Sequence, residues 1–342
     1  MPHRTFFWFI LPSLAAMFLF IALPLVSVAV QSMFVEHEQV MKTTKNCGPF
    51  GCKEELSVDA EATAKLKEER PLGRFNGLGT YFDRGHLAVS EVSELWQNRT
   101  SIGGFIKSVY NLPLYRAIAF TLTYTFVVTP LVIFFGLLIA LGVNRLPGML
   151  KGPTIFLSLL PMIVTPLIGA LILYWMIDAQ GIIGKTLQWI FDDPELSLKA
   201  SAPLTWITLI VYGVWHSSPF AFVVFYAGLQ TVNTDALEAA QIDGATRFQR
   251  IRYVVIPHLT PLVVFIALIQ LMDNFRVFEP IVSFSAEANA TSLSVSIFSD
   301  LRGDVMRFNS AAATSVLTVI GVAILLTPVL IRTWRDFKGK AV

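Results

Sequence analysis

Leu237-Glu238-Ala239-Ala240-Gln241-Ile242-Asp243-Gly244-Ala245 is the stretch that decides how this chain folds, together with Val254-Val255-Ile256-Pro257 shortly after it. The first segment is polar and rich in small residues, and it lies between two long apolar runs. A bilayer core requires about 20 predominantly apolar residues for each helix that crosses it. The polar segment therefore cannot belong to a crossing helix, and we predict that it forms a loop at a membrane surface.

The composition of the whole chain supports a membrane protein. Hydrophobic residues make up 54% of the sequence and charged residues only 15%, whereas soluble domains carry about 25% charge. We predict an all-α polytopic membrane protein with six transmembrane helices. They are expected at Phe6–Val30, Ile118–Val143, Thr154–Ile177, Leu204–Leu229, Leu259–Val282 and Ser310–Ile331.

The charges outside these spans predict the orientation. An even number of spans places both termini on one side, and the segments on that side carry ten Lys or Arg against four Asp or Glu. The short loops opposite, 178–203 and 281–309, carry four basic and seven acidic residues. Basic residues concentrate in cytoplasmic loops. Both termini and the 237–245 segment are therefore expected in the cytoplasm.

Three regions are predicted along the chain. Residues 1–33 form the first transmembrane helix with a cytoplasmic N-terminus, and residues 34–116 form a periplasmic loop region. Residues 117–342 form the membrane core, with a cytoplasmic loop at 230–257. The periplasmic region contains an expected exposed helix at Lys53–Arg70, because Glu and Lys alternate there without a broad apolar face.

The two cysteines of the chain, Cys47 and Cys52, lie close together in the periplasmic region. In an oxidising compartment we expect a disulfide that closes the turn between them. A metal site would need more ligands than this segment offers, so none is predicted.

The 230–257 loop is predicted to form two short helices at a corner. Thr234-Asp235 can cap the first helix, and Asp235 followed by Glu238 suggests a capping box. Gly244 permits a sharp turn. A second helix is expected over Thr246–Val255, before Pro257 opens the next span.

This segment resembles the cytoplasmic signature of permease subunits of binding-protein-dependent ABC importers, in particular the maltose-type and glycerol-phosphate-type carbohydrate permeases. Glu238, Ala239, Ala240 and Gly244 match the signature, and Asp243 and Phe248 match its form in sugar permeases. The resemblance implies the type I ABC importer permease fold. It also implies that these six residues dock on an ATP-hydrolysing subunit.

The resemblance further implies the assembly. A chain of this family works with a second permease subunit, and the long loop favours a heterodimer. The expected assembly also contains two ATPase subunits that bind ATP and Mg, and a periplasmic solute-binding protein. It is expected in a bacterial inner membrane. The chain itself is expected to bind no cofactor and no nucleic acid. It contains no combination of nucleophile, base and orienting acid, so catalysis by this subunit is not expected.

The fifth span contains the candidate solute path. Gln270, Asp273, Asn274 and Arg276 lie within a membrane segment, where polar side chains face protein or water. Asn274 and Arg276 would hydrogen-bond solute hydroxyls, and Phe275 or Phe278 would stack on a sugar ring. The alternative is an ion-pair network, in which Asp273 and Glu279 both reach Arg276 along one helical face and hold helices together.

Two other classes of membrane protein remain open at this point. An ion-gradient-driven secondary transporter of a small polar solute would need intramembrane proton or sodium relays and commonly has inverted repeats. Acidic residues near mid-span are confined to Asp273 and Glu279, and no repeat is evident. A channel or receptor subunit would not associate with an ATPase.

Overall fold

A computed structural model describes residues 3–37, 40–48, 51–99, 101–303 and 306–339. The described chain is predominantly helical and divides into two compact units. The first unit comprises residues 1–115 and 296–319, and the second comprises residues 116–295 and 320–342. This division differs from the predicted one in the position of residues 296–319, which group with the N-terminal part of the chain.

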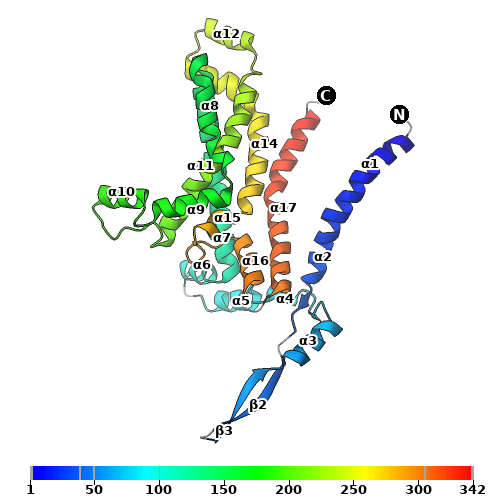
Figure 1. The fold of residues 1–342 in the computed structure, drawn as a ribbon. Coiled ribbons are helices and arrows are strands. Elements are labelled where there is room, and N and C mark those ends of the chain that lie inside the picture. The colour runs from blue at the N-terminus through cyan, green and yellow to red at the C-terminus, as the bar shows by residue number, and fades with distance from the viewer. Residues whose placement is uncertain (1–2, 38–39, 49–50, 100, 304–305, 340–342) are drawn as a thin grey trace. The chain divides into compact units, whose positions relative to one another are not determined.

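The first unit begins with a long apolar rod. Helix α1 (His3–Met17) continues through a π-helical turn (Phe18–Ala22) into α2 (Leu23–Gln31) (Figure 1). A small extramembrane region follows, and its elements are β1 (Phe34–Val35), β2 (Met41–Gly48), β3 (Gly51–Val58), α3 (Ala60–Glu69), β4 (Arg74–Phe75), α4 (Gly79–Phe82), α5 (Val89–Gln97) and α6 (Ile102–Tyr110). Strand β1 pairs with β4, and β2 pairs with β3, both antiparallel.

These strands correct one prediction. The helix expected at Lys53–Arg70 is wrong in its first part, because residues up to Val58 form β3 and the helix starts only after Asp59. The side chain of Asp59 accepts a hydrogen bond from the Ala62 amide and so fixes that start. The fold is therefore helical, as predicted, with a small β hairpin added.

The hairpin register places Cys47 directly opposite Cys52. Directly opposite positions in an antiparallel pair have Cα atoms about 4.5–5.5 Å apart, which is within the range that a disulfide spans. The side chains of both cysteines lie outside the described residues, so the bridge itself stays a prediction.

The extramembrane region of the first unit is fastened to the start of α17 (Phe308–Gly339). The Asn309 amide donates to the Glu36 carboxylate over 2.7 Å, and the Asn309 side chain donates to the Leu72 carbonyl over 3.4 Å. The His86 Nε2 atom lies 3.1 Å from the Ser310 carbonyl oxygen. The bond to Glu36 occupies a backbone amide of the first helical turn, whose amides have no intrahelical partners.

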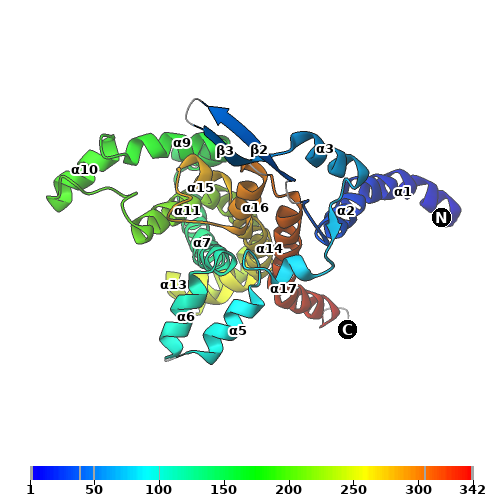
Figure 2. The ribbon, with the colours of Figure 1, turned by 90° about the horizontal axis from the view of Figure 1, so that it is seen from below.

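The second unit contains most of the membrane helices. In chain order the helices of this unit are α7 (Pro113–Asn144), α8 (Gly148–Ile163), α9 (Pro166–Ile177), α10 (Ile182–Phe191), α11 (Ala202–Leu229), α12 (Thr234–Ile242), α13 (Arg247–Arg250), α14 (Ile256–Phe275) and α15 (Glu279–Ser283). The first residues of α16 (Leu293–Arg302) and the part of α17 from Ile320 onward also belong to it. Helix α11 packs along both α8 and α14. Figures 1 and 2 show α9 and α10 extending away from this bundle, and Figure 1 shows α12 at its far end.

Five described helices are long and apolar enough to cross a membrane, and a bent pair makes up to six. The predicted spans are therefore confirmed in number when the bent pair counts as one. The third span is not a continuous helix over Thr154–Ile177, because α8 and α9 meet at 94°. Pro166 explains the break, since a residue before proline is disfavoured in the helical region, and Thr165 is extended with ψ 145°.

The fifth span also departs from its prediction. Helix α14 ends at Phe275 instead of continuing to Val282, and the short helix α15 starts at Glu279. In a continuous helix the ring of Pro280 would clash with the carbonyl of Arg276, four residues earlier. The chain therefore unwinds between these helices, and Arg276 adopts φ −102° and ψ 21°.

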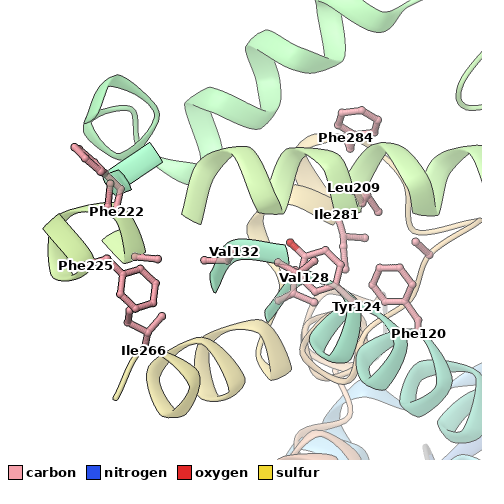
Figure 3. Close-up of a cluster of buried hydrophobic side chains, with 14 of the residues drawn as sticks. Phe120, Tyr124, Val128, Val132, Leu209, Phe222, Phe225, Ile266, Ile281 and Phe284 are labelled. Carbon is pink, nitrogen blue, oxygen red and sulfur yellow. The ribbon is translucent and has the colours of Figure 1, made fainter. Parts of the chain in front are cut away.

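The core of the second unit is apolar and built from α7, α11, α14 and the segment after α14. Figure 3 shows this cluster and labels Phe120, Tyr124, Val128, Val132, Leu209, Phe222, Phe225, Ile266, Ile281 and Phe284. Helices α7 and α11 lie close together at Gly136, where an added Cβ atom would lie 2.5 Å from the Ala221 Cβ atom. Small residues permit such close approach between membrane helices.

We predict that Gly136→Val destabilises the protein by about 1–3 kcal/mol, the usual cost of overpacking a core. The matched control is Gly142→Val on the same helix, because a Cβ atom there meets nothing within 4 Å. Thermal or denaturant unfolding of the purified chain in detergent measures both. Equal stability of the two variants would show that α7 and α11 do not pack at Gly136.

Candidate coupling surface and solute cavity

The loop between α11 and α14 forms a compact corner, which we call the knob (residues 230–255). Its first helix, α12, is capped by Asn233, whose side chain accepts from the Asp235 amide over 2.8 Å. The predicted cap at Thr234-Asp235 with a box to Glu238 is therefore wrong by one residue. An Asn side chain caps a helix as well as Asp does, so the sequence allowed either choice.

Gly244 ends α12, and its backbone conformation favours glycine. Its φ is +81°, and an added Cβ atom would meet nothing within 4 Å. The Ala245 amide donates to the Ala240 carbonyl, and the Gly244 amide donates to the Gln241 carbonyl. This pair of bonds is the Schellman arrangement, which turns the chain sharply after a helix. The turn predicted at Gly244 is confirmed.

The second helix of the knob has the capping box that was expected in the first. Thr246 accepts from the Gln249 amide, and the Gln249 side chain accepts from the Thr246 amide over 2.7 Å. The prediction that this helix ends at Val255 is wrong. It continues through a π-helical turn (Ile251–Val255) into α14, so the knob and the fifth span form one helical rod. Arg250 Nη1 donates to Gln241 Oε1 over 2.9 Å and ties this rod to α12.

The outer surface of the knob carries most of the residues that were predicted to dock on a partner. Glu238, Ala239, Asp243, Gly244 and Phe248 are exposed, and Ala240 is half-buried. Ile242 was not among the predicted docking residues, yet its side chain is 86% exposed, and Phe248 is 75% exposed. Large apolar side chains standing out from a polar corner are typical of an interaction surface.

A second feature of this unit is a cavity of about 470 Å³. This volume lies within the range of small-molecule sites, about 300–1,000 Å³. The lining combines aromatic, polar and charged side chains, and comprises Tyr124, Pro166, Tyr212, Gly213, His216, Ser217, Asp273, Asn274, Arg276, Val277, Glu279 and Pro280.

Both helix breaks border this cavity. Pro166 starts α9 after the 94° bend, and Arg276 and Val277 lie in the unwound segment after α14. Side chains from elsewhere bind carbonyl groups at both breaks. The Tyr212 hydroxyl donates to the Pro166 carbonyl over 2.8 Å, and Ser292 donates to the Val277 carbonyl over 2.6 Å. Irregular backbone at membrane depth is tolerated where protein buries it or where it lines a water-filled cavity.

His216 belongs to the same arrangement. Its Nε2 atom lies 3.3 Å from the Val164 carbonyl oxygen, and its ring stacks on Tyr212. Its hydrogen bond therefore supports the bend between α8 and α9.

The residues predicted for the solute path fall into two groups. Asp273, Asn274 and Arg276 line the cavity, whereas Gln270, Phe275 and Phe278 do not. Phe275 is buried, and its ring lies where a side chain at Gly321 of α17 would clash. Stacking of Phe275 on a solute is therefore not possible in this conformation.

Asn274 connects two helices. Its buried side-chain amide donates to the Thr129 hydroxyl of α7 over 3.1 Å and to Gln270 Oε1 over 3.4 Å. The Arg276 guanidinium donates to Asp273 Oδ1 over 3.0 Å, and both side chains are more than half exposed. This ion pair lies within one helix end, and Glu279 lies beyond it. The continuous helical face that the ion-pair alternative required does not exist.

Comparison with known proteins identifies the family. Residues 100–334 match the family described as "Binding-protein-dependent transport system inner membrane component". The chain belongs to this family. The prediction of an ABC importer permease, drawn from residues 237–257, is confirmed. The chain is thus a multi-pass membrane component of a transport system, and the secondary-transporter and channel alternatives have no support.

Several curated relatives are similar over most of their length. A probable ABC transporter permease of Sinorhizobium fredii is 29% identical over 234 residues, which is 67% of this chain and 73% of that protein. A trehalose/maltose transport system permease of Thermococcus litoralis is 25% identical over 254 residues, which is 71% of this chain and 82% of that protein. A galactooligosaccharides transport system permease of Bacillus subtilis is 25% identical over 272 residues, which is 77% of this chain and 65% of that protein.

Solved structures support the fold. A chain of a bacterial ABC transporter involved in the import of the acidic polysaccharide alginate superposes with a TM-score of 0.58 at 21% identity. The match covers 81% of this chain and 97% of that one. At this identity the similarity establishes the fold, which is the type I importer permease fold predicted from the sequence.

Asn274 and Arg276 are expected to contribute differently to the stability of the protein. Asn274→Ala removes a buried hydrogen bond between helices and should lower the free energy of unfolding by about 1–2 kcal/mol. Arg276→Gln removes an exposed ion pair and should change it by less than about 1 kcal/mol. Unfolding of the purified variants in detergent measures both. If Arg276→Gln is the more destabilising variant, the ion pair holds helices together after all.

Proposed function

We propose that this chain moves a carbohydrate across the inner membrane through the cavity between its broken helices, driven by ATPase subunits that bind the knob. The observation that carries the proposal is the meeting of both helix breaks at one polar, aromatic cavity. Discontinuous helices mark the substrate sites of many transporters, because their freed backbone groups and the ends of the half-helices can contact the solute.

The lining of the cavity suits a carbohydrate. Asp273, Asn274 and Arg276 offer donors and acceptors for hydroxyl groups, and Tyr124 and Tyr212 place aromatic rings beside them. Relatives point the same way, since two of them are named as permeases of trehalose/maltose and galactooligosaccharide transport systems. An arginine also binds carboxylate or phosphate groups. We therefore extend the proposed solute class to glycosides, polyols and anionic sugars.

The knob is the proposed docking site for an ATPase subunit. Its exposed face combines small residues, which allow close approach, with Ile242 and Phe248, which would bury apolar surface in a groove of the partner. A rigid contact is required, because movement of the partner has to reach the membrane helices. The Schellman turn, the capping box and the Arg250–Gln241 bond provide that rigidity.

The remaining parts of the proposal follow from the family. The working assembly contains a second, different permease subunit, two ATPase subunits that hold ATP and Mg, and a periplasmic binding protein that delivers the solute. This chain supplies no catalytic group. The excess of basic residues beside the knob and at the termini supports a cytoplasmic position for them.

Transport by the reconstituted assembly tests the function. Proteoliposomes that contain both permeases and the ATPase are given binding protein and radiolabelled sugar, chosen as the sugar that raises the melting temperature of the binding protein. ATP-dependent uptake supports the proposal. Uptake that proceeds without ATP, driven by an ion gradient, would contradict it.

Substitutions at Gly244 test the coupling role. Valine at φ +81° is strained by about 1–2 kcal/mol or more, so Gly244→Val should reorient the two helices of the knob and reduce binding-protein-stimulated ATPase activity severalfold. Asparagine tolerates this conformation, so Gly244→Asn is the matched control and should retain most activity. If the binding protein stimulates ATPase activity normally in both variants, the geometry of the knob does not matter for coupling.

A further inference from the structure

A second cavity lies behind the knob and has a different chemical character. It measures about 220 Å³ and is located where α7 and α11 end and the rod of α13 and α14 begins. Its lining residues are Leu141, Asn144, Arg145, Leu229, Val232, Leu237, Arg247, Arg250, Ile251 and Val255. The lining thus contains three arginines and no acidic residue.

The charges of these arginines are not balanced within the cavity lining. Among the described residues, neither Arg145, Arg247 nor Arg250 forms an ion pair. The Nε atom of Arg250 is also buried without a hydrogen-bond partner, although its Nη1 atom donates to Gln241. Buried polar groups are nearly always hydrogen-bonded, and an exception calls for an explanation such as a bound ion. Arg145 and Arg247 are exposed and Arg250 is half-buried, and an anion between the three guanidinium groups would lower their mutual repulsion.

Phosphate is the anion that this geometry suits. The guanidinium fork donates two parallel hydrogen bonds to a phosphate group, and several arginines can share its oxygens. A phosphate could come from solution or from a lipid, and two observations favour a lipid. The other side of the cavity is apolar, with Leu141, Leu229, Val232, Leu237, Ile251 and Val255. The cavity also lies at the ends of three candidate membrane spans, and lipid headgroups are found where transmembrane helices end.

We propose that this cavity, the arginine cavity, binds the phosphate of an anionic phospholipid. Basic pockets between transmembrane helices bind lipid headgroups in this way. The bound lipid would neutralise Arg145 at the end of α7 together with Arg247 and Arg250 at the base of the knob. It would thereby stiffen the junction between the knob and the membrane helices. The binding step does not depend on which solute the cavity between the broken helices accepts.

Lipid titration of the assembled transporter tests this site. The complex with its partner permease and ATPase subunits is purified in neutral phosphatidylcholine and titrated with phosphatidylglycerol, and bound lipid is counted by native mass spectrometry. Arg250→Gln and, separately, Arg145→Gln should each weaken phosphatidylglycerol binding about tenfold, because each removes charge-assisted hydrogen bonds. Arg252→Gln is the matched control, because Arg252 is an exposed neighbour that does not line the cavity, and it should bind like the wild type.

Three results would overturn the proposal. The first is equal phosphatidylglycerol binding by all variants. The second is displacement of the lipid by millimolar inorganic phosphate, which would assign the arginines to a free anion. The third is loss of the ATPase subunits from Arg145→Gln in neutral lipid, which would assign this arginine to a carboxylate of that partner. Sugar uptake by the wild type in neutral lipid is measured in parallel, so that failure of the lipid site and failure of the transport function are distinguished.

Discussion

The demand of backbone amides and carbonyls for hydrogen bonds inside a bilayer governs this structure. Lipid offers no partners, so every crossing segment must be helical, and any unwound stretch must find partners within the protein. The second unit unwinds at two such places, and each is supported from another helix or loop. Tyr212 and His216 of α11 bind carbonyls at the α8–α9 bend, and Ser292 binds the Val277 carbonyl after α14. The polar cavity exists because these breaks exist.

A single rod connects this cavity to the knob. Residues Arg247–Phe275 form a continuous helical span of 29 residues, which corresponds to about 43 Å at 1.5 Å per residue. Its first turn carries the exposed Phe248, and its last turn carries Asp273 and Asn274 at the cavity. A displacement of the knob would therefore reach the cavity through one stiff element. Fixation of the start of the rod by Arg250–Gln241 serves that purpose.

The sequence predicted the spans and the family, but not the breaks. Apolar length locates the membrane helices, and residues 237–257 identify the family. Proline alone does not predict a break, since Pro130, Pro219 and Pro328 all lie inside unbroken helices. The bend at Pro166 differs because Tyr212 and His216, about fifty residues later, accommodate it. Likewise, the burial of Phe275 depends on Gly321 and that of Asn274 on Thr129. Such partners are distant in the sequence, and a single amino-acid sequence does not reveal which of them meet.

The central claim is that solute passes through the cavity between the broken helices, and one measurement tests it directly. In the assembled transporter with Cys47 and Cys52 replaced by serine, a cysteine is introduced at Ser217, which lines the cavity. Its rate of reaction with a small water-soluble thiol reagent is then followed during ATP-driven turnover. The account predicts that the transported sugar slows this reaction, whereas a sugar that the binding protein does not bind leaves it unchanged. Identical rates with both sugars would contradict it.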